Sequence, residues 1–283
     1  MDLQKEKFKI HKYSYGGKTK VFYQIVLSSL KGLTAYRANM LMSIAIGPVS
    51  LAAQYFIWRS LLNGSETVNG MSFDMMMTYY AFATLLHIFI GDSVAYLLSQ
   101  QIYSGSLISI LLKPVNHFSY FFFDKIGKKI FSILLEVVPL ALIFILIFKI
   151  NLIPYELFWA VISVSIAFIH IFLMNFCIGL TAFWLTNNWS IILTIGFITS
   201  ICSGLLLPLD FFPAIFQKVL FILPFNFMYY IPTRVMLGNY QLAGISLEVP
   251  QVVLLQFTYL AAMLCITIFL WKRGLKKFMG VGM

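Results

Sequence analysis

The chain has 283 residues, of which 60% are hydrophobic, 17% are aromatic and only 11% are charged. Soluble domains carry about 25% charged and about 45–50% apolar residues, so this composition excludes a soluble enzyme, and the abundant aromatics exclude a disordered chain. The net charge is +10, and the positions of the basic residues decide whether it indicates an anionic partner or a membrane orientation. We therefore expect an all-α integral membrane protein.

Residues 1–40 are expected to form a cytoplasmic tail that ends in an amphipathic helix. Over 18–37, apolar side chains recur every three or four residues, while lysine, glutamine and arginine occupy the other angles of the helix. This pattern is typical of a helix in the membrane interface, with basic residues toward anionic headgroups. Such a helix either anchors the first span or transmits force to it. The apolar positions are Phe22, Val26, Leu30, Leu33 and Tyr36.

Six apolar segments follow and make residues 41–283 a transmembrane domain. A spanning helix needs about 20 apolar residues, and each segment meets or approaches that length. The fourth is long enough to tilt, and the fifth is short for a full span. The expected spans are 41–62, 76–98, 130–148, 157–184, 191–207 and 252–271.

The basic residues give the orientation of these spans. An even number of spans places both termini on one side, and sixteen of the twenty Lys and Arg residues then lie on that side. The positive-inside rule makes it the cytoplasmic side. The charge is therefore an orientation signal, and no nucleic-acid partner is expected. The four remaining basic residues, on the outer side, are Arg59, Lys149, Lys218 and Arg234.

The cytoplasmic stretch 101–129 contains a short apolar helix candidate. Ser104-Gly105-Ser106 offers a serine cap before the apolar run, and a proline after it stops the helix. The resulting helix of about two turns exposes apolar side chains, and an apolar patch on such a loop usually marks a protein partner. The alternative is that it packs against the spans of its own chain. The candidate residues are Gly105, Leu107, Ile108, Leu111, Leu112, Lys113 and Pro114.

The outer region 208–250 holds apolar stretches that are too short to span and are punctuated by prolines. Such segments are interfacial or re-entrant, and we expect a pair of short half-helices that dip into the outer leaflet. One extra hairpin of spans is the competing interpretation, but it would place prolines within the membrane. The candidate cap residues are Pro208, Asp210, Phe212, Pro213, Pro224, Phe225 and Pro232.

The sequence offers little chemistry for an enzyme. The four histidines lack metal-ligand spacing, Gly17-Lys18-Thr19 lacks the earlier glycine of a phosphate-binding loop, and no catalytic motif is recognised. The three cysteines lie in apolar stretches and are expected to be buried free thiols. Charged groups at bilayer depth are costly, so Asp92 and Glu136 are the intramembrane candidates. Three roles are open to them. They make structural contacts, through hydrogen bonds between helices or by reaching lysines; they line a translocation path; or they relay protons.

Two stretches together resemble a known family. Gly105 followed by Leu111-Leu112-Lys113-Pro114-Val115 resembles the cytoplasmic loop of the six-span permeases of type-2 ATP-binding-cassette (ABC) exporters. The outer segment of these permeases, before the last span, is similar to a second set of residues here. That set is Leu207-Pro208-Leu209-Asp210-Phe211-Phe212-Pro213, Leu223-Pro224-Phe225, Pro232 and Gly238.

The resemblance implies a transport subunit rather than an enzyme. The stretch from Gly105 to Pro114 would be the coupling helix that docks on a separate ABC ATPase, and the helix over 18–37 would be the connecting helix beside it. The half-helices would cap the exit path. The resemblance further implies a dimer with a second permease subunit, the same chain or a paralogue, in a bacterial cell membrane. ATP and Mg would bind only to the ATPase, so this chain would hold no cofactor.

The cargo is less well defined by the sequence. Spans rich in Phe, Tyr and Met suit an amphiphilic or hydrophobic cargo such as a peptide, a drug or a lipid-linked molecule. The same residues would equally well face lipid or pack between helices. An ion-coupled secondary transporter that uses Asp92 and Glu136 is the alternative function.

Overall fold

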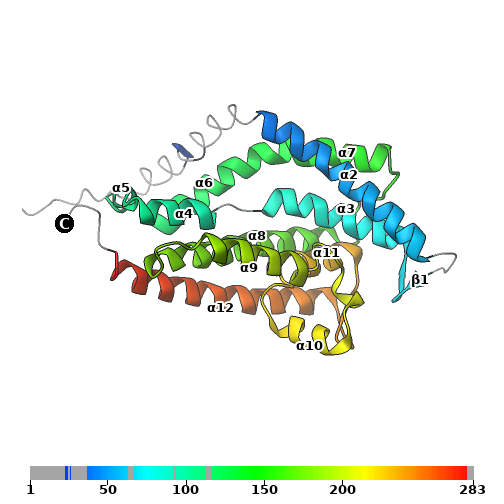
Figure 1. Ribbon diagram of the computed structural model, residues 1–283. Coiled ribbons are helices and arrows are strands. Elements are labelled where there is room, and N and C mark those ends of the chain that lie inside the picture. Colours follow the sequence, from blue (N-terminus) through cyan, green and yellow to red (C-terminus); the bar gives the residue numbers. More distant parts are fainter. Residues whose placement is uncertain are drawn as a thin grey trace, which may run out of the picture.

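The computed structural model describes residues 37–62, 67–91, 94–112 and 116–278, together with 23, 24 and 26. These residues are mostly helical (Figure 1). Most of the expected amphipathic helix, together with Asp92, Lys113 and Pro114, lies outside the described residues.

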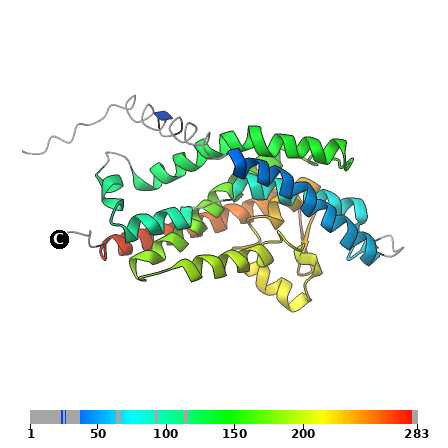
Figure 2. The same ribbon diagram turned by 45° about the horizontal axis from the view of Figure 1, so that its top comes forward.

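The long helices lie roughly side by side, and the molecule has two distinct ends (Figures 1 and 2). The coupling-helix candidate α5 and the end of the last helix, α12, lie at one end, which we call the α5 end. Residues 208–247, which we call the cap segment, lie toward the opposite end, the cap end, with the first hairpin.

The first helix, α2 (Arg37–Leu62), leads into a small hairpin that the sequence analysis did not anticipate. Strands β1 (Thr67–Val68) and β2 (Met71–Ser72) pair antiparallel. The turn is Asn69-Gly70, with φ of 50° and 76°, and Asn-Gly favours such tight hairpin turns because both residues tolerate positive φ.

The expected second span consists of two helices, α3 (Phe73–Ile90) and α4 (Val94–Tyr103). Helix α3 ends at Gly91, which has extended backbone with ψ of 149° and donates its N–H to His87 O at 2.9 Å. A break frees carbonyl groups at the end of a helix, and a cation is a favourable partner for them. Lys129 Nζ donates to Ile88 O at 2.7 Å and fills that role.

The expected third span belongs to a longer helical stretch. Helix α6 (His117–Ser132) continues through a π-helical turn (Ile133–Val137) into α7 (Val138–Leu146). The helix therefore begins well before residue 130, inside the stretch expected to be a cytoplasmic loop. Pro139 lacks an N–H and so cannot continue the regular hydrogen-bond ladder, which accounts for the widened turn just before it.

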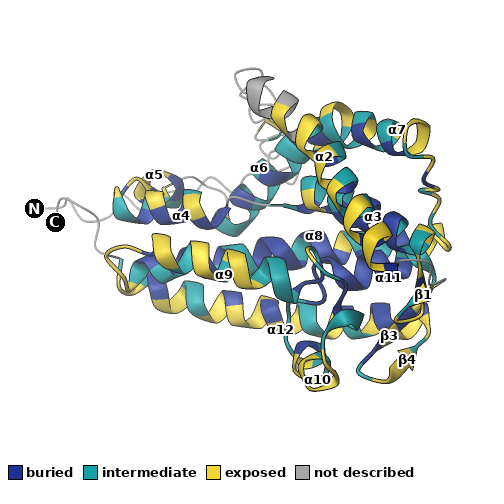
Figure 3. Cartoon of the chain, turned by 45° about the vertical axis from the view of Figure 1, so that its right-hand side comes forward, coloured by how far each residue is buried: buried dark blue, intermediate teal, exposed yellow. Residues whose placement is uncertain are grey.

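Helix α8 (Leu157–Leu180) is the central helix and packs against α12 (Val249–Leu275), α4 and the cap segment. A 3-10 turn (Thr181–Phe183) follows it and leads toward α9 (Trp189–Cys202). No residue of α9 is buried, and Figure 3 shows this helix largely in the colours of exposed and half-buried residues.

Four helical stretches of the described chain are long and apolar enough to cross a membrane, judged by length and composition. Helix α9 is apolar but shorter than a full span, as the sequence predicted for the fifth segment. The six-span count therefore remains an expectation. The four stretches are Phe73–Tyr103, His117–Leu146, Leu157–Phe183 and Val249–Leu275.

The cap segment holds two short helices, as expected, and a hairpin that was not. A 3-10 turn (Leu209–Phe211) precedes α10 (Ala214–Ile222), and α11 (Tyr230–Leu237) follows. Strands β3 (Tyr240–Leu242) and β4 (Ile245–Leu247) then pair antiparallel. The two helices differ sharply, because α11 is almost wholly buried whereas α10 buries only Leu220.

The cysteines are free thiols, but the expectation that all are buried is wrong. Cys177 and Cys202 are half-buried, and Cys265 is exposed on α12. An apolar helix in a membrane exposes its side chains to lipid, so an apolar sequence context does not by itself imply burial within the protein.

Candidate functional site

The coupling-helix candidate is a five-residue helix, α5 (Leu107–Leu111), with one apolar face buried and one exposed. Leu107 and Ile110 are buried in a cluster with aromatic residues of α6 and α8. Ile108 and Leu112 are 37% and 80% exposed. Half of the helix therefore packs against its own chain, as one alternative holds, and the other half is exposed, so a partner at that face stays a prediction.

The turn before α5 is set by glycine rather than by a serine cap. Gly105 is buried with a φ of 70°, a conformation that favours glycine, and it reverses the chain between α4 and α5. The expected serine cap is absent: Ser106 has helical dihedral angles and its side chain makes no capping bond. Ser104 Oγ lies 2.7 Å from Ser106 Oγ instead.

Glu136 lies in the π-helical turn, half-buried, and accepts a hydrogen bond from Ser132 Oγ at 3.2 Å. The two residues are one turn apart on the same helix. Two lysines of α6, which precedes Glu136, make other contacts, since Lys128 pairs with Asp124 and Lys129 contacts α3. Asp92 is outside the described residues, so its role stays a prediction.

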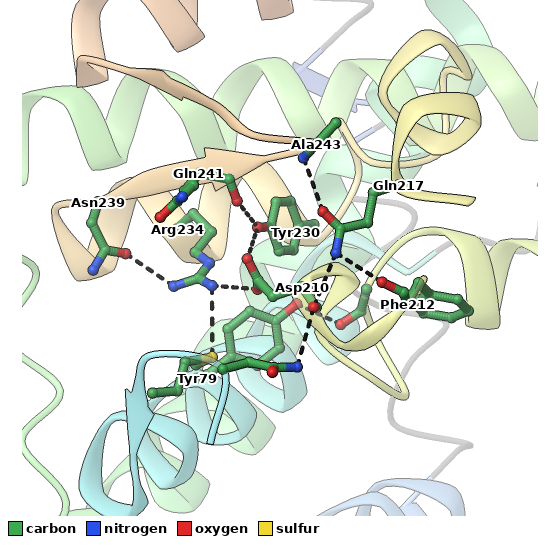
Figure 4. A network of polar contacts seen from close by, with 12 residues as sticks. Tyr79, Asp210, Phe212, Gln217, Tyr230, Arg234, Asn239, Gln241 and Ala243 are labelled. Atoms are coloured by element: carbon green, nitrogen blue, oxygen red, sulfur yellow. Dashed lines mark hydrogen bonds and ion pairs between the residues drawn. The ribbon is translucent and has the colours of Figure 1, made fainter. Parts of the chain in front are cut away.

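An ion pair between Asp210 and Arg234 lies at the centre of the cap segment (Figure 4). Both side chains are largely buried. Arg234 also donates through Nη1 to Asn239 Oδ1 at 3.0 Å. The Tyr230 hydroxyl lies 2.8 Å from both Asp210 Oδ1 and the carbonyl of Gln241, and shares its proton between them. The pair thus joins the turn before α10 to α11 and β3.

Burial and the ion pair set the protonation of this cluster. Burial raises the pKa of Tyr230 well above its usual value, so the hydroxyl stays a neutral donor. Burial lowers the pKa of Arg234, but Tyr230 and Asp210 outweigh that effect and raise it overall, so the guanidinium stays charged. Burial likewise raises the pKa of Tyr240 above its usual value.

Gln217 connects α10 to the rest of the cap segment (Figure 4). Its Nε2 donates to the carbonyls of Asp210 at 3.0 Å and Phe212 at 2.8 Å. Its Oε1 accepts from the N–H of Ala243, in the β3–β4 turn, at 2.9 Å. One side chain therefore provides hydrogen-bond partners for three backbone groups that a regular helix or sheet does not satisfy.

The cap segment also contacts α3 and the end of α9. Tyr79 of α3 donates its hydroxyl to Gly204 O at 2.6 Å, and its ring lies 6.4 Å from that of Tyr230. Arg234 Nη2 lies 3.6 Å from Sδ of Met71, in strand β2 of the first hairpin. The network therefore ties together three stretches that are far apart in sequence.

The predicted cap residues divide into two groups. Asp210 and Phe212 belong to the network, and Pro208 and Pro213 stand at the starts of the 3-10 turn and of α10. The remaining three lie apart from it. Pro224 presents its carbonyl to His170 Nε2 at 3.1 Å, Phe225 packs against the α3–α8 cluster, and Pro232 is buried within α11.

Two cavities lie beside α3. One, of about 670 Å³, opens at the cap end between α2, α3 and the residues after α7, and Tyr55, Asp74 and Lys149 line it. The other, of about 380 Å³, lies between α3, α8 and α9 beside the residues before α11. Its polar lining includes His87 and Tyr229, whose Nδ1 and hydroxyl lie 3.1 Å apart. Within the described residues, no group of three potential metal ligands occurs.

The sequence analysis missed Tyr230, Gln217 and the pairing role of Arg234. Arg234 was counted only as an outer cation, although a basic residue in an apolar, proline-rich stretch with one nearby acid, Asp210, is a usable signal for a buried ion pair. The His87–Tyr229 contact had no comparable signal, because the two residues are 142 positions apart.

Comparison with known proteins places these observations in a family. The family model described as "ABC-2 family transporter protein" matches residues 49–282. A comparison with curated proteins gives no match at the significance required. Because the family match covers most of the chain, the protein belongs to the ABC-2 transporter family and is a membrane-embedded permease subunit of a type-2 ABC transporter.

Proposed function

We propose that this chain is one of two permease subunits of an ATP-driven exporter, and that separate ABC ATPases dock on α5. The second permease is the same chain or a paralogue, and the cargo is amphiphilic or hydrophobic. ATP and Mg bind on the ATPases, and this chain carries no cofactor. Both termini lie in the cytoplasm of a bacterial cell. The observation that carries the proposal is the two-faced burial of α5.

Helix α5 is built to pass on a push from a docked partner. Leu107 is fully buried and Ile110 is 4% exposed, in the same cluster as Phe121 of α6 and Phe172 of α8. A close-packed cluster transmits displacement because it deforms little. A partner bound to the opposite face, at Ile108 and Leu112, would therefore move α5 together with the helices beneath it.

The cap segment would close the outer end of the path. The Asp210–Arg234 pair and Gln217 join its turns, helices and strands by buried polar contacts, which supports a rigid plug rather than a flexible loop. Exposed Ile215, Phe216 and Ile222 on α10 support contact with the outer leaflet.

Co-purification of the ATPase tests the proposal. The variant Ile108→Asp with Leu112→Asp places two charges on the exposed face of α5 while leaving Leu107 and Ile110 untouched. We expect it to lose most of the ATPase that co-purifies with the wild-type chain in mild detergent. The matched control, Ile108→Leu with Leu112→Ile, keeps an apolar face and should retain the ATPase. Equal recovery with both variants would overturn α5 as the docking site.

The ion-coupled alternative is not favoured. Membership of an ABC permease family points to ATP as the energy source. The contact of Glu136 with Ser132 on its own helix supports a structural role for that carboxylate.

A further inference from the structure

The cavity of about 380 Å³ beside the break in the second span combines an apolar wall with a set of neutral polar groups. It lies between the last turn of α3, the second half of α8 and most of the length of α9. Gly91, where α3 ends, forms part of its lining. The polar side chains come from four segments of the chain, and they are His87, Asn175, Thr199, Ser200 and Tyr229.

His87 is the polar group whose exposure needs an explanation. It lies near the middle of the apolar stretch Phe73–Tyr103, and its side chain is exposed rather than covered. The Tyr229 hydroxyl lies 3.1 Å from Nδ1 of the His87 ring, and Nε2 of the ring has no hydrogen-bond partner among the described residues. A polar group that faces hydrocarbon without a partner is costly, so this edge of the ring is suited to water or a ligand rather than lipid.

Two other polar side chains of the cavity use only part of their hydrogen-bonding capacity on their own helices. Asn175 Nδ2 donates to Ile171 O at 3.1 Å, and Ser200 Oγ donates to Gly196 O at 3.0 Å. Each bond uses one donor, so the amide oxygen of Asn175 and the lone pairs of the Ser200 hydroxyl remain for a ligand. Both residues are thus held in place and still able to bind.

The described lining of the cavity carries no charged side chain, since none of these residues is Asp, Glu, Lys or Arg. The cation whose charge acts on His87, Lys129, lies outside the lining and donates to Ile88 O. An ionic group brought to this depth without an opposite charge would lose its hydration uncompensated. Donors and acceptors without charge match an amide or a hydroxyl, and the apolar wall of Met174, Phe197 and Leu205 matches a hydrocarbon body.

We propose that this cavity is a cargo subsite for an uncharged amphiphile, with His87 and Tyr229 contacting its amide or hydroxyl head. The assignment rests on the proposed transport function and narrows its cargo class. The volume lies near the lower end of ligand pockets, so the subsite takes a head group and the adjoining chain rather than a whole large molecule.

Photolabelling of the intact permease–ATPase complex in lipid nanodiscs tests the assignment. The probes are three decyl diazirines of one chain length, ending in a primary amide, a carboxylate or a trimethylammonium group. We expect the amide probe to label peptides that cover 171–178 and 192–200, about fivefold or more above either charged probe. Equal labelling by all three, or labelling outside these peptides, would overturn the assignment.

Variants in the cavity sharpen the test. His87→Leu and Tyr229→Phe each remove hydrogen-bonding capacity, and each should lower amide labelling about fivefold. His117→Leu removes a histidine at the start of α6 outside the cavity, and it should leave labelling unchanged. Because His87→Leu could disturb folding, Tyr229→Phe, which removes only a hydroxyl, is decisive: unchanged labelling in a complex that still retains its ATPase would refute the role of the pair.

Adding ATP and Mg separates cargo from a resident lipid. A cargo subsite changes its occupancy as the cycle turns, so labelling should fall, whereas equal labelling with and without ATP would identify a resident lipid and overturn the cargo assignment. A failure of the proposed function can be distinguished from a failure of the cavity assignment. If no ATPase co-purifies while the amide probe still labels the cavity, the exporter proposal falls and the cavity stands as a binding site.

Discussion

At the scale of single residues, the Asp210–Arg234 pair carries the largest concentration of buried charge in the cap segment. The two charges neutralise each other, Tyr230 donates to Asp210, and Arg234 donates to Asn239, while Arg234 Nε is buried without a partner among the described residues. Breaking a buried pair by removing one partner costs about 3–5 kcal/mol, because it leaves an uncompensated charge away from water. The pair therefore makes the folding of the cap segment conditional on both residues.

Arg234→Met should lower the free energy of unfolding by about 3–5 kcal/mol, since the Asp210 carboxylate then stays buried without its cation. Thermal unfolding of the purified chain in detergent measures the change. Lys218→Met, which removes an exposed cation on α10, is the control and should shift stability by less than about 0.5 kcal/mol. Similar losses of stability in both variants would show that the buried pair stabilises the protein no more than an exposed cation does.

At the scale of elements, the contact between α4 and α8 depends on a glycine. A Cβ on Gly179 would lie 3.0 Å from the carbonyl oxygen of Ala95 and 3.1 Å from Leu98 Cβ. The same contact carries buried Ser99, which donates to Ala95 O at 2.7 Å and accepts from Asn188 Nδ2 at 2.7 Å. The two helices can be this close only because position 179 has no side chain.

Gly179→Ala should therefore push α4 from α8 and destabilise the protein by about 1–3 kcal/mol, the usual cost of overpacking. Gly196→Ala on α9 is the matched control, because a Cβ there meets nothing within 4 Å. Alanine is the better helix former by about 1 kcal/mol, so the control should be neutral or mildly stabilising. Thermal unfolding of the two variants side by side decides the matter, and a stable Gly179→Ala would contradict the packing argument.

The positions of many helices along the chain could be predicted from the sequence. Long apolar runs indicate where α2, α8 and α12 lie, and prolines correctly divide the cap segment into two short helices. The break at Gly91 was not predictable in the same way, because an isolated glycine is tolerated inside apolar helices and the Lys129 that contacts the end of α3 is distant in sequence. The first hairpin had a readable signal in Asn69-Gly70.

The functional residues also divide into those with a local sequence signal and those that depend on residues distant in sequence. The exposed face of α5 was expected from its own short sequence, but the burial of Leu107 depends on aromatic residues of two other helices. The role of Gln217 was hidden because its three partners are backbone groups, whose positions no side-chain pattern records. Local patterns predict elements, whereas a site built from several elements needs their arrangement.

At the scale of the whole molecule, α9 is one of the apolar faces that the single chain leaves uncovered, and it is the α-helix of the described chain with the fewest buried residues for its length. It buries none of its own residues, and Phe197 is 66% exposed. We expect the second permease subunit to cover this face. Benzoylphenylalanine in place of Phe197 should, on irradiation of the intact complex, capture a permease subunit whose mass identifies it as the same chain or a paralogue.

The control for this experiment is the same photoreactive residue in place of Phe158, which is 69% exposed on α8. It should capture lipid and little protein. Capture of a permease subunit at position 158 rather than 197 would move the dimer interface away from α9.

The break at Gly91 has a mechanical consequence. A continuous helix of the length of Phe73–Tyr103 would behave as a rod, and tilting one end would swing the other. Helix α3 ends at Gly91 and α4 begins only at Val94, so the two behave as separate rods with a joint. Helix α4 can then follow α5 while α3 stays fixed to Gly204 and to Tyr230 of the cap segment through Tyr79. In the proposed exporter, movement at the α5 end would then open the inner half of the permease without moving the cap segment, which is the order of events that alternating access requires.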